Sequence, residues 1–398
     1  MINHSCVPNA FIGFDKRTAM LRAERPIAEG EEIQISYIGA SSPLSSPDVV
    51  LILPTDVTLP RSVRRDRLKL YHFQCVCPRC KDDLDVYQVC AASPVLDLNK
   101  FSLQPNLHKL RNPIVDRSKI SSATAETIHK ACNSPTVSKG GGEAFQQCWK
   151  LCRRLGEAGM WAVEPVPSFI LDTVTSRGGE PSMAAYLLSL TCFLATECDP
   201  VELVAPFLAA RVKTVMMIAR LLSETARQTA MRELATNAPL KDLVDVLEGC
   251  DQVSICEAAL RLVVHHATIG ASADWEVLQE AKEMLQEVEA LEGREKETAM
   301  LRQWATDPEG PEAAAFFHAA VLQPVNQLAA LAPRVMDEIA REVAGRGRKA
   351  VVNSNSSGVV ARGISKSLET TNAASDMSVD DFLKNSEKVF FNRFRDGK

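Results

Sequence analysis

Two short stretches decide how the first part of this chain folds: Asn3-His4-Ser5-Cys6-Val7-Pro8-Asn9 and, farther along, Cys75-Val76-Cys77-Pro78-Arg79-Cys80. The second has the pattern C-x-C-x-x-C, which supplies three thiolates. A structural zinc site is closed by four ligands in a tetrahedron, so this cluster is one ligand short. The spacing therefore predicts a zinc site whose fourth ligand comes from elsewhere in the chain.

The source of that fourth ligand stays open on spacing alone. Cys90 can complete the site, or the three cysteines can be unligated thiols. Disulfides are not expected, because the chain is long and shows no secretory signal. The other cysteines stand among apolar residues with helical spacing, and we expect them to be small buried hydrophobes: Cys90, Cys132, Cys148, Cys152, Cys192, Cys198, Cys250 and Cys256.

Length and charge exclude several classes of protein. With 398 residues the chain exceeds the usual size of one domain, so we expect two or more folding units. The net charge of −5, with both signs mixed, offers no basic stripe, and direct nucleic-acid binding is not expected. Apolar stretches such as 186–195 are too short to span a bilayer. These features predict a soluble intracellular protein without membrane contact.

Between the two cysteine-bearing stretches, residues 10–37 have the apolar runs and alternation of β-strands. Residues 10–14 and 18–23 are apolar runs around Asp15-Lys16-Arg17, and they predict a β-hairpin with a three-residue connection. In the stretch Gly30-Glu31-Glu32-Ile33-Gln34-Ile35-Ser36-Tyr37, apolar and polar residues alternate from Ile33 on. This period of two predicts a strand.

A loop and a helix follow before the cysteines. Residues 39–60 are rich in proline and serine and predict a loop insertion, with one edge strand over 49–53. Residues 62–71 predict a short basic helix. Arg64, Arg65 and Arg67 in this helix can face an acidic partner or simply solvate it, and a run of charges is usually a solvated face.

The second half of the chain has the spacing of helices. Apolar residues recur every three to four positions within 144–344, for example at Cys148, Trp149, Cys152 and Leu155. Before them, prolines interrupt 84–143, which we interpret as a connector.

The end of the chain has a different composition. Residues 345–378 are rich in Gly, Ser, Asn and Ala and predict a flexible tether. Ser378 and Asp381 can cap a terminal helix that either docks on the helical part or frays.

Taken in order, the motifs NHSC-x-PN, GEE-x-x-x-SY and C-x-C-x-x-C resemble the C-terminal part of a SET-domain lysine methyltransferase with its post-SET zinc site. The resemblance covers 1–83. The stretch 64–75, RRDRLKLYHFQC, is most similar to the SET-and-MYND branch of that family.

This resemblance implies the C-terminal part of a β-rich SET fold with a post-SET zinc site. The helical spacing and the composition of the remaining chain add a mainly α-helical domain and a disordered tail, so the expected fold class is α+β. The corresponding boundaries are 1–60 for the SET part with its loop insertion, 61–83 for the post-SET zinc segment, 84–143 for the connector, 144–344 for the helical domain and 345–398 for the tail with a terminal helix.

The resemblance also implies a set of site residues. Cys6 becomes the fourth zinc ligand beside Cys75, Cys77 and Cys80. Tyr37 becomes the catalytic tyrosine that orients the lysine amine; on its own it would read as a strand-ending core tyrosine. The implied cofactors are S-adenosylmethionine and Zn²⁺.

Three further residues correspond to contacts with S-adenosylmethionine. The resemblance places Asn3 at the amino-acid end of the cofactor and His4 near its adenine, chiefly through the backbone. Phe73 corresponds to an aromatic that packs on the adenine ring, a suitable face for a purine. Phe73 can equally be a core residue that anchors the cysteine loop.

The chain departs from the family pattern in one respect. SET enzymes carry an early Gly-x-Gly loop in the cofactor pocket, whereas the glycine-rich text here, at 140–142 and 345–347, lies after Tyr37. We therefore expect an N-terminally truncated protein-lysine methyltransferase of the nucleus or cytoplasm, acting on histone or non-histone lysines. The rival is a catalytically inactive zinc-bearing scaffold whose helical domain binds protein partners. A zinc finger for nucleic acid is disfavoured, because no pair of histidines follows the cysteines.

Overall fold

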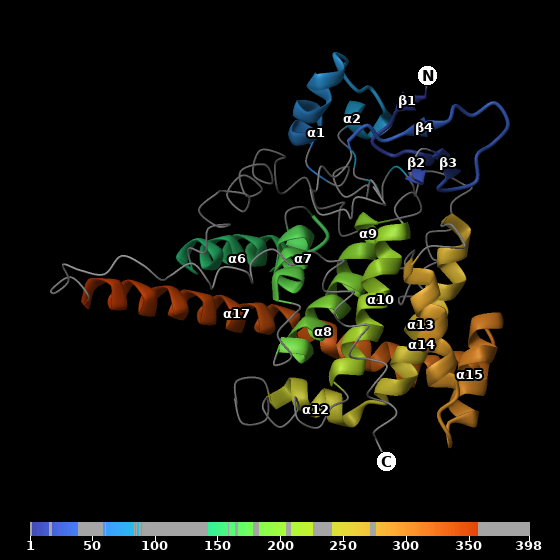
Figure 1. Cartoon of the computed structure of the whole chain (residues 1–398), viewed down its shortest axis with the longest axis vertical. Coiled ribbons are helices and arrows are strands. Elements are labelled where there is room, and N and C mark those ends of the chain that lie inside the picture. Colours follow the sequence, from blue (N-terminus) through green and yellow to red (C-terminus); the bar gives the residue numbers. More distant parts are fainter. Residues whose placement is uncertain are drawn as a thin grey trace.

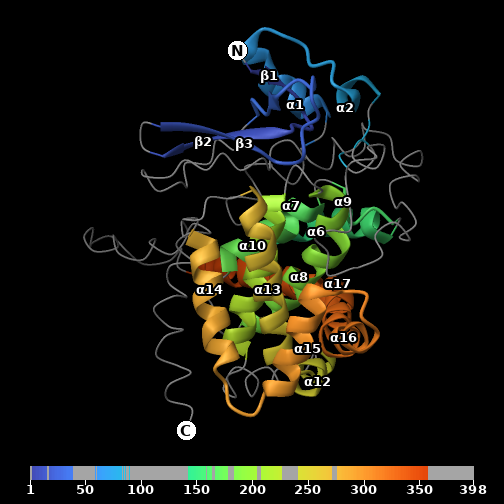
Figure 2. The same cartoon turned by 90° about the vertical axis from the view of Figure 1, so that its right-hand side faces the viewer.

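The computed structural model describes these residues of the chain: 2–15, 18–38, 59, 61–82, 84, 86, 89, 142–157, 159–163, 166–177, 183–203, 208–225, 241–270 and 276–356. The edge strand predicted at 49–53, most of the predicted connector and the helix predicted from Ser378 lie outside them, as do Cys90 and Cys132. Figures 1 and 2 show the strands beyond one end of a body of helices, on the side of α9 (Asp199–Glu202).

The predicted hairpin is confirmed. Strand β2 (Ala10–Asp15) pairs antiparallel with β3 (Thr18–Ala23), from Ala10 opposite Ala23 to Asp15 opposite Thr18. Asp15 thus belongs to the strand rather than to the connection, which is shorter than the spacing predicted.

A second pair of strands joins the stretch that begins at Asn3 to the stretch that ends at Tyr37. Strand β1 (Asn3–His4) runs parallel to β4 (Gln34–Ile35), which is shorter than the strand predicted from Ile33 to Tyr37. The buried Asn9 supports this pairing: its Nδ2 donates to the carbonyl oxygen of Glu32 at 2.9 Å, and its Oδ1 accepts from the backbone N–H of Gln34 at 2.8 Å. The motifs NHSC-x-PN and GEE-x-x-x-SY therefore form one structural unit.

The basic helix predicted at 62–71 is confirmed as α1 (Arg61–Leu68), extended by the 3₁₀ turn η2 (Lys69–Tyr71). The chain leaves η2 through His72, whose φ of 56° is left-handed. It then enters the short helix α2 (Pro78–Lys81). Proline suits the first helical turn, where its missing N–H costs no hydrogen bond.

The remaining described elements are helical. They are α6 (Gly142–Glu157), α7 (Val166–Arg177), α8 (Ala184–Phe193), η6 (Leu194–Cys198), α9, α10 (Leu208–Thr225), α12 (Lys241–Gly249), α13 (Gln252–Gly270), α14 (Glu276–Glu289), α15 (Glu295–Thr306), α16 (Pro311–Phe317), η9 (His318–Leu322) and α17 (Gln323–Ser356). Both η6 and η9 are π-helical turns that join one α-helix to the next. The described part of the chain is thus mainly helical with a small β part, and its strands are too short to make it β-rich.

Helix packing buries a large apolar core. Helix α17 lies against α6 and α8, α10 lies against α8 and α13, and α13 also contacts α14 and α15. The buried faces follow the predicted helical spacing; on α6 they carry Cys148, Trp149, Cys152 and Leu155. The expectation of buried thiols holds for Cys148, Cys152, Cys192, Cys198 and Cys256, and Cys250 is half-buried.

One boundary differs from the sequence prediction. Helix α17 continues to Ser356, so 345–356, predicted as part of a tether, are helical. Only four of the twelve residues in 345–356 are strong helix formers, so local propensity did not predict this continuation of the helix. Among the described helices, none is both long and apolar enough for a membrane crossing.

Candidate metal centre and aromatic cluster

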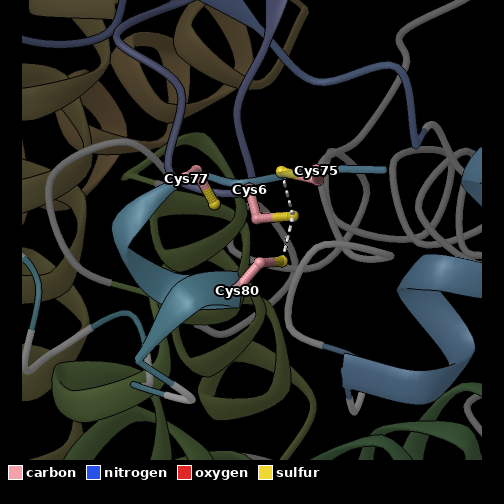
Figure 3. Close-up of side chains that lie close together, drawn as sticks. All are labelled: Cys6, Cys75, Cys77 and Cys80. Atoms are coloured by element: carbon pink, nitrogen blue, oxygen red, sulfur yellow. Dashed lines mark hydrogen bonds between the residues drawn. The ribbon is translucent and has the colours of Figure 1, made fainter. Parts of the chain in front are cut away.

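Four cysteine sulfurs meet beside the parallel strands (Figure 3). Cys6 follows β1, Cys75 and Cys77 lie between η2 and α2, and Cys80 belongs to α2. The Cys6 Sγ lies 4.0 Å from the Cys75 Sγ and 3.5 Å from the Cys80 Sγ, and all four sulfurs lie within 4.8 Å of one another. The structure thus brings Cys6 to the C-x-C-x-x-C cluster. Cys90 is outside the described residues.

The local fold of the second stretch explains how its sulfurs converge. The Cys77 carbonyl accepts from the backbone N–H groups of Cys80 and Lys81, both at 2.9 Å. This tight turn starts helix α2 and carries Cys77 and Cys80 to the same side (Figure 3). Cys6, Cys75 and Cys80 are buried and Cys77 is half-buried, so the centre is closed to solvent on most sides.

The arrangement fits a tetrahedral zinc ion. A Zn–S bond of about 2.3 Å implies sulfur-to-sulfur edges of about 3.8 Å, which lies inside the observed range of separations. The donor set is four cysteines, as in structural zinc sites. The bonds among the four thiols lower the pKa of Cys80 and Cys77 and raise the pKa of Cys6 and Cys75, so without a metal ion the four groups do not all ionise together. A thiolate is the form that binds metal.

His4 links the cysteine centre to Tyr37 through its side chain. The backbone N–H of Tyr37 donates to His4 Nδ1 at 2.9 Å, and His4 Nε2 lies 3.4 Å from the Cys6 Sγ. Burial lowers the pKa of His4 to about 4, so the ring is neutral. Because Nδ1 accepts, the ring proton lies on Nε2, which can donate to the Cys6 sulfur. The sequence reasoning missed this link, since it used the family role of the His4 backbone.

Tyr37 lies in an aromatic cluster. Its ring centroid is 5.4 Å from that of His4, 5.0 Å from that of Tyr71 and 6.0 Å from that of Phe73. Its hydroxyl donates to the backbone carbonyl of Ile2. The structure therefore brings Tyr37, His4 and Phe73 together, although they are far apart in sequence.

Tyr71 belongs to this cluster, and Asn3 lies next to it as the sequence neighbour of His4. Asn3, next to His4 in β1, is exposed, and its Nδ2 donates to a carboxylate oxygen of Glu32. The hydroxyl of Tyr71 donates to the carbonyl of Tyr37 at 3.2 Å. The sequence reasoning placed Tyr71 only at the end of the basic helix. Its position two residues before Phe73 was the signal that could have added it.

Two buried arginines lie beside the centre, and one of them, Arg64, departs from the expectation that the charges of the basic helix face solvent. Arg64 is only 3% exposed, and its Nη2 donates to the Cys80 Sγ at 3.7 Å. Arg79 is 4% exposed and donates from Nη1 to the Cys6 carbonyl at 3.5 Å. Arg67, on the same helix as Arg64, is exposed as expected. The signal was the spacing of four between Arg64 and the buried Leu68, which share one helix face.

The apolar cover of the centre comes from both parts of the molecule. Ile38, Leu68 and Val86 pack with the cysteines, and so does Val201 of α9. The half-buried Ala162 and Leu203 lie against the same cluster. The helical part therefore contributes directly to the wall of the cysteine centre.

Comparison with known proteins gives the first part of the chain a family context. Residues 1–38 match the SET domain family model. Over 83 residues the chain is 39% identical to SET domain and MYND-type zinc finger protein 6 of Schizosaccharomyces pombe, which is 21% of this chain and 14% of that protein.

Two further similarities involve proteins named as methyltransferases. N-lysine methyltransferase SMYD2-B of Danio rerio is 32% identical over 114 residues, 28% of this chain and 22% of that protein. Histone-lysine N-methyltransferase ASHR1 of Arabidopsis thaliana is 33% identical over 82 residues, 21% of this chain and 14% of that protein. The matched stretches thus span less than a quarter of each relative.

Proposed function

Because its first part is that of a SET-and-MYND-like lysine methyltransferase, we propose that this chain belongs to an S-adenosylmethionine-dependent protein-lysine N-methyltransferase. The observation that carries the proposal is the meeting of His4, Tyr37 and Phe73 beside one cysteine centre. The proposed substrate is a lysine side chain of a histone or another protein, and the proposed site of action is the nucleus, the cytoplasm or both.

The residues present suit the cofactor. Phe73 is 38% exposed and presents an aromatic face, and Asn3 next to His4 presents an exposed amide. An aromatic face can pack on a purine, and an amide can bond an amino-acid group. We assign Phe73 to the adenine, Asn3 to the amino-acid end and the His4 backbone to the adenine edge. The bound cofactor would supply the methyl group on its sulfonium.

Tyr37 is assigned to the lysine. A free lysine has a pKa of about 10.4, so a methyltransferase must favour the neutral amine, which alone is nucleophilic. Aromatic walls help, because desolvation disfavours the charged form. Tyr37, half-buried among His4, Tyr71 and Phe73, stands in such surroundings. Its hydroxyl would orient the amine for attack, a positional contribution to the rate.

The cysteine centre has a structural part in this proposal. Zinc held by Cys6, Cys75, Cys77 and Cys80 would join the end of β1 to the segment that carries Phe73. It would also fix His4, whose ring contacts the Cys6 sulfur and the Tyr37 backbone. We propose 61–83 as the post-SET segment and 144–344 as a helical domain that follows it.

The test is a calorimetric titration of S-adenosylmethionine into the zinc-loaded chain, with transfer of a labelled methyl group to core histones as the second readout. We expect a dissociation constant in the micromolar range. Tyr37→Phe should keep binding and lose transfer. Tyr186→Phe, on α8 in the helical part, is the matched control and should behave as wild type.

A different result selects the alternative. A chain that holds one zinc ion yet binds no S-adenosylmethionine would be the inactive scaffold, whose helical part binds protein partners. Transfer that survives Tyr37→Phe unchanged would remove Tyr37 from the assignment.

A further inference from the structure

A buried guanidinium points at the cysteine centre. Arg64 lies on α1, one turn before the buried Leu68, and is 3% exposed. Its Nη2 donates to the Cys80 Sγ at 3.7 Å, and its Nη1 donates to the Leu59 carbonyl. Within the described part of the chain, no carboxylate forms an ion pair with Arg64. A buried positive charge is costly unless a negative group lies close to it.

A second guanidinium approaches from the opposite stretch. Arg79 stands between Cys77 and Cys80 in the C-x-x-C turn, is 4% exposed, and donates to the Cys6 carbonyl at 3.5 Å. Arg64 of α1 thus bonds a sulfur of the centre directly, whereas Arg79 of α2 bonds the backbone of one of its cysteines.

The charge of the centre explains the position of Arg64. Four thiolates around Zn²⁺ leave two net negative charges, and the Arg64 guanidinium offsets one of them. We propose that Arg64 is a positioning residue that partly neutralises a buried tetrathiolate zinc centre through an N–H···S bond to Cys80. The proposal rests on the zinc site of the proposed function. Partners outside the metal shell tune metal affinity in the same way at other sites.

A purely architectural reading makes a different claim. Arg64 also anchors the carbonyl of Leu59, so its loss could loosen α1 without any effect of charge. Charge compensation and architectural anchoring predict different effects of losing Arg64 in a variant whose cysteine centre carries less negative charge. Replacing one thiolate by a neutral imidazole leaves one net negative charge. Charge compensation by Arg64 then matters less, whereas an architectural anchor keeps its full value.

The experiment measures the rate at which zinc passes from the whole chain to an excess of a chromophoric chelator. Arg64→Met should speed release by about tenfold to a hundredfold, the usual effect of losing such a partner. Arg64→Lys, which keeps the charge, should recover most of the loss. Arg67→Met is the matched control, because Arg67 is exposed on the same helix, and it should release zinc as wild type does.

The decisive comparison repeats Arg64→Met in the Cys77→His background, since Cys77 is the half-buried ligand. There the effect of Arg64→Met should shrink to less than about threefold, because the remaining charge is smaller. If Arg64→Met speeds zinc release equally in both backgrounds, the proposal is overturned. It is also overturned if Arg64→Lys releases zinc as fast as Arg64→Met. A wild-type chain without zinc would instead overturn the metal site itself.

If Cys77→His fails to hold zinc, cobalt in the unaltered cysteine set decides. A guanidinium bonded to the Cys80 sulfur withdraws electron density from it. Arg64→Met should therefore move the sulfur-to-cobalt charge-transfer band to longer wavelength, and Arg64→Lys should move it less. An unchanged band in Arg64→Met overturns the proposal.

Discussion

The N-terminal part, 2–86, and the helical part, 142–356, hold themselves together by different means. The core of the first is a small cluster in which Cys6, Cys75 and Cys80 sit among a few apolar side chains, with two buried arginines beside them. The core of the second is much larger, and a buried arginine beside it, Arg220, pairs with the carboxylate of Glu280. Every large apolar side chain exposed within the described residues, such as Leu70 at 82% and Val76 at 79%, belongs to the first part. A small core of this kind needs a staple, whereas the helices do not.

Metal removal should separate the two parts most strongly. Cys6→Ala should abolish zinc binding and unfold 2–38 and 61–82, because structural zinc supplies about 10–16 kcal/mol of binding free energy that this core cannot replace. The helical part should keep its far-ultraviolet circular dichroism. The zinc content reports on the N-terminal part, and hydrogen exchange measures the opening of each part separately. Cys192→Ala, a buried thiol in α8, is the control and should keep its zinc.

A core truncation in the helices should have the opposite pattern. Leu188 in α8 is fully buried. Leu188→Ala should lower the free energy of unfolding of the helical part by about 2–5 kcal/mol, through lost burial and a cavity. Urea melts followed by circular dichroism measure this effect. The zinc content should stay at the wild-type value, and a parallel loss of zinc would show that the two parts fold as one unit.

A residue on the boundary tests how far the parts are independent. Val201 in α9 packs into the cysteine cluster, whereas Val212 in α10 packs only within the helical core. Val201→Ala should cost about 1–2 kcal/mol and also speed zinc release, because it opens the wall of the centre. Val212→Ala should cost a similar amount with zinc release unchanged. Identical zinc release in the two variants would contradict the boundary role of Val201.

A helix cap in the helical part should respond to pH. Asp251 precedes α13 and accepts from the Ser254 N–H at 3.2 Å, and Arg294 donates to it at 2.9 Å. Asp251→Ala should cost about 1 kcal/mol at neutral pH. Burial raises the pKa of this carboxyl, but the bonds from Arg294 and Ser254 outweigh it and leave the pKa below its usual value.

The sign of the pH effect follows from that lowered pKa. The contribution of Asp251 is complete above the unfolded value of about 3.9 and is lost as pH falls through the lower folded value. The difference between wild type and Asp251→Ala in urea melts should therefore shrink at low pH. A constant difference down to pH 2 would mean that the carboxylate charge is not what stabilises the helix start.

The smallest effect is expected at His72. Its φ of 56° lies in the left-handed region, which glycine adopts without cost. His72→Gly should change stability by less than about 1 kcal/mol and leave zinc release unchanged, whereas His72→Val should speed it, since a β-branched residue resists this conformation. Chelator competition compares the two. Equal rates would show that this turn does not position Cys75.

The sequence predicted periodic elements well and non-local partners poorly. The hairpin and the basic helix could be predicted because their patterns are local. The pairing of β1 with β4 could not, since two-residue strands carry no period. The side chains of Asn9 and His4, which bond the backbone of 32–37, show why the strands pair. Cys6 could be predicted as the fourth zinc ligand only through the resemblance of its motif to the SET family. The burial of Arg64 had a local signal in its spacing from Leu68, but the sulfur that it bonds could not be foreseen, because that sulfur belongs to another element of the chain.

The distance along the chain between the sulfurs has a consequence for topology. Cys6 and Cys75 are 69 positions apart, so a zinc ion between them would act as a reversible cross-link across a long loop. Closing such a loop in the unfolded chain is worth about 4 kcal/mol in the polymer description of cross-links. A protease cut between 38 and 59 would then leave two pieces that migrate as one until the metal is removed.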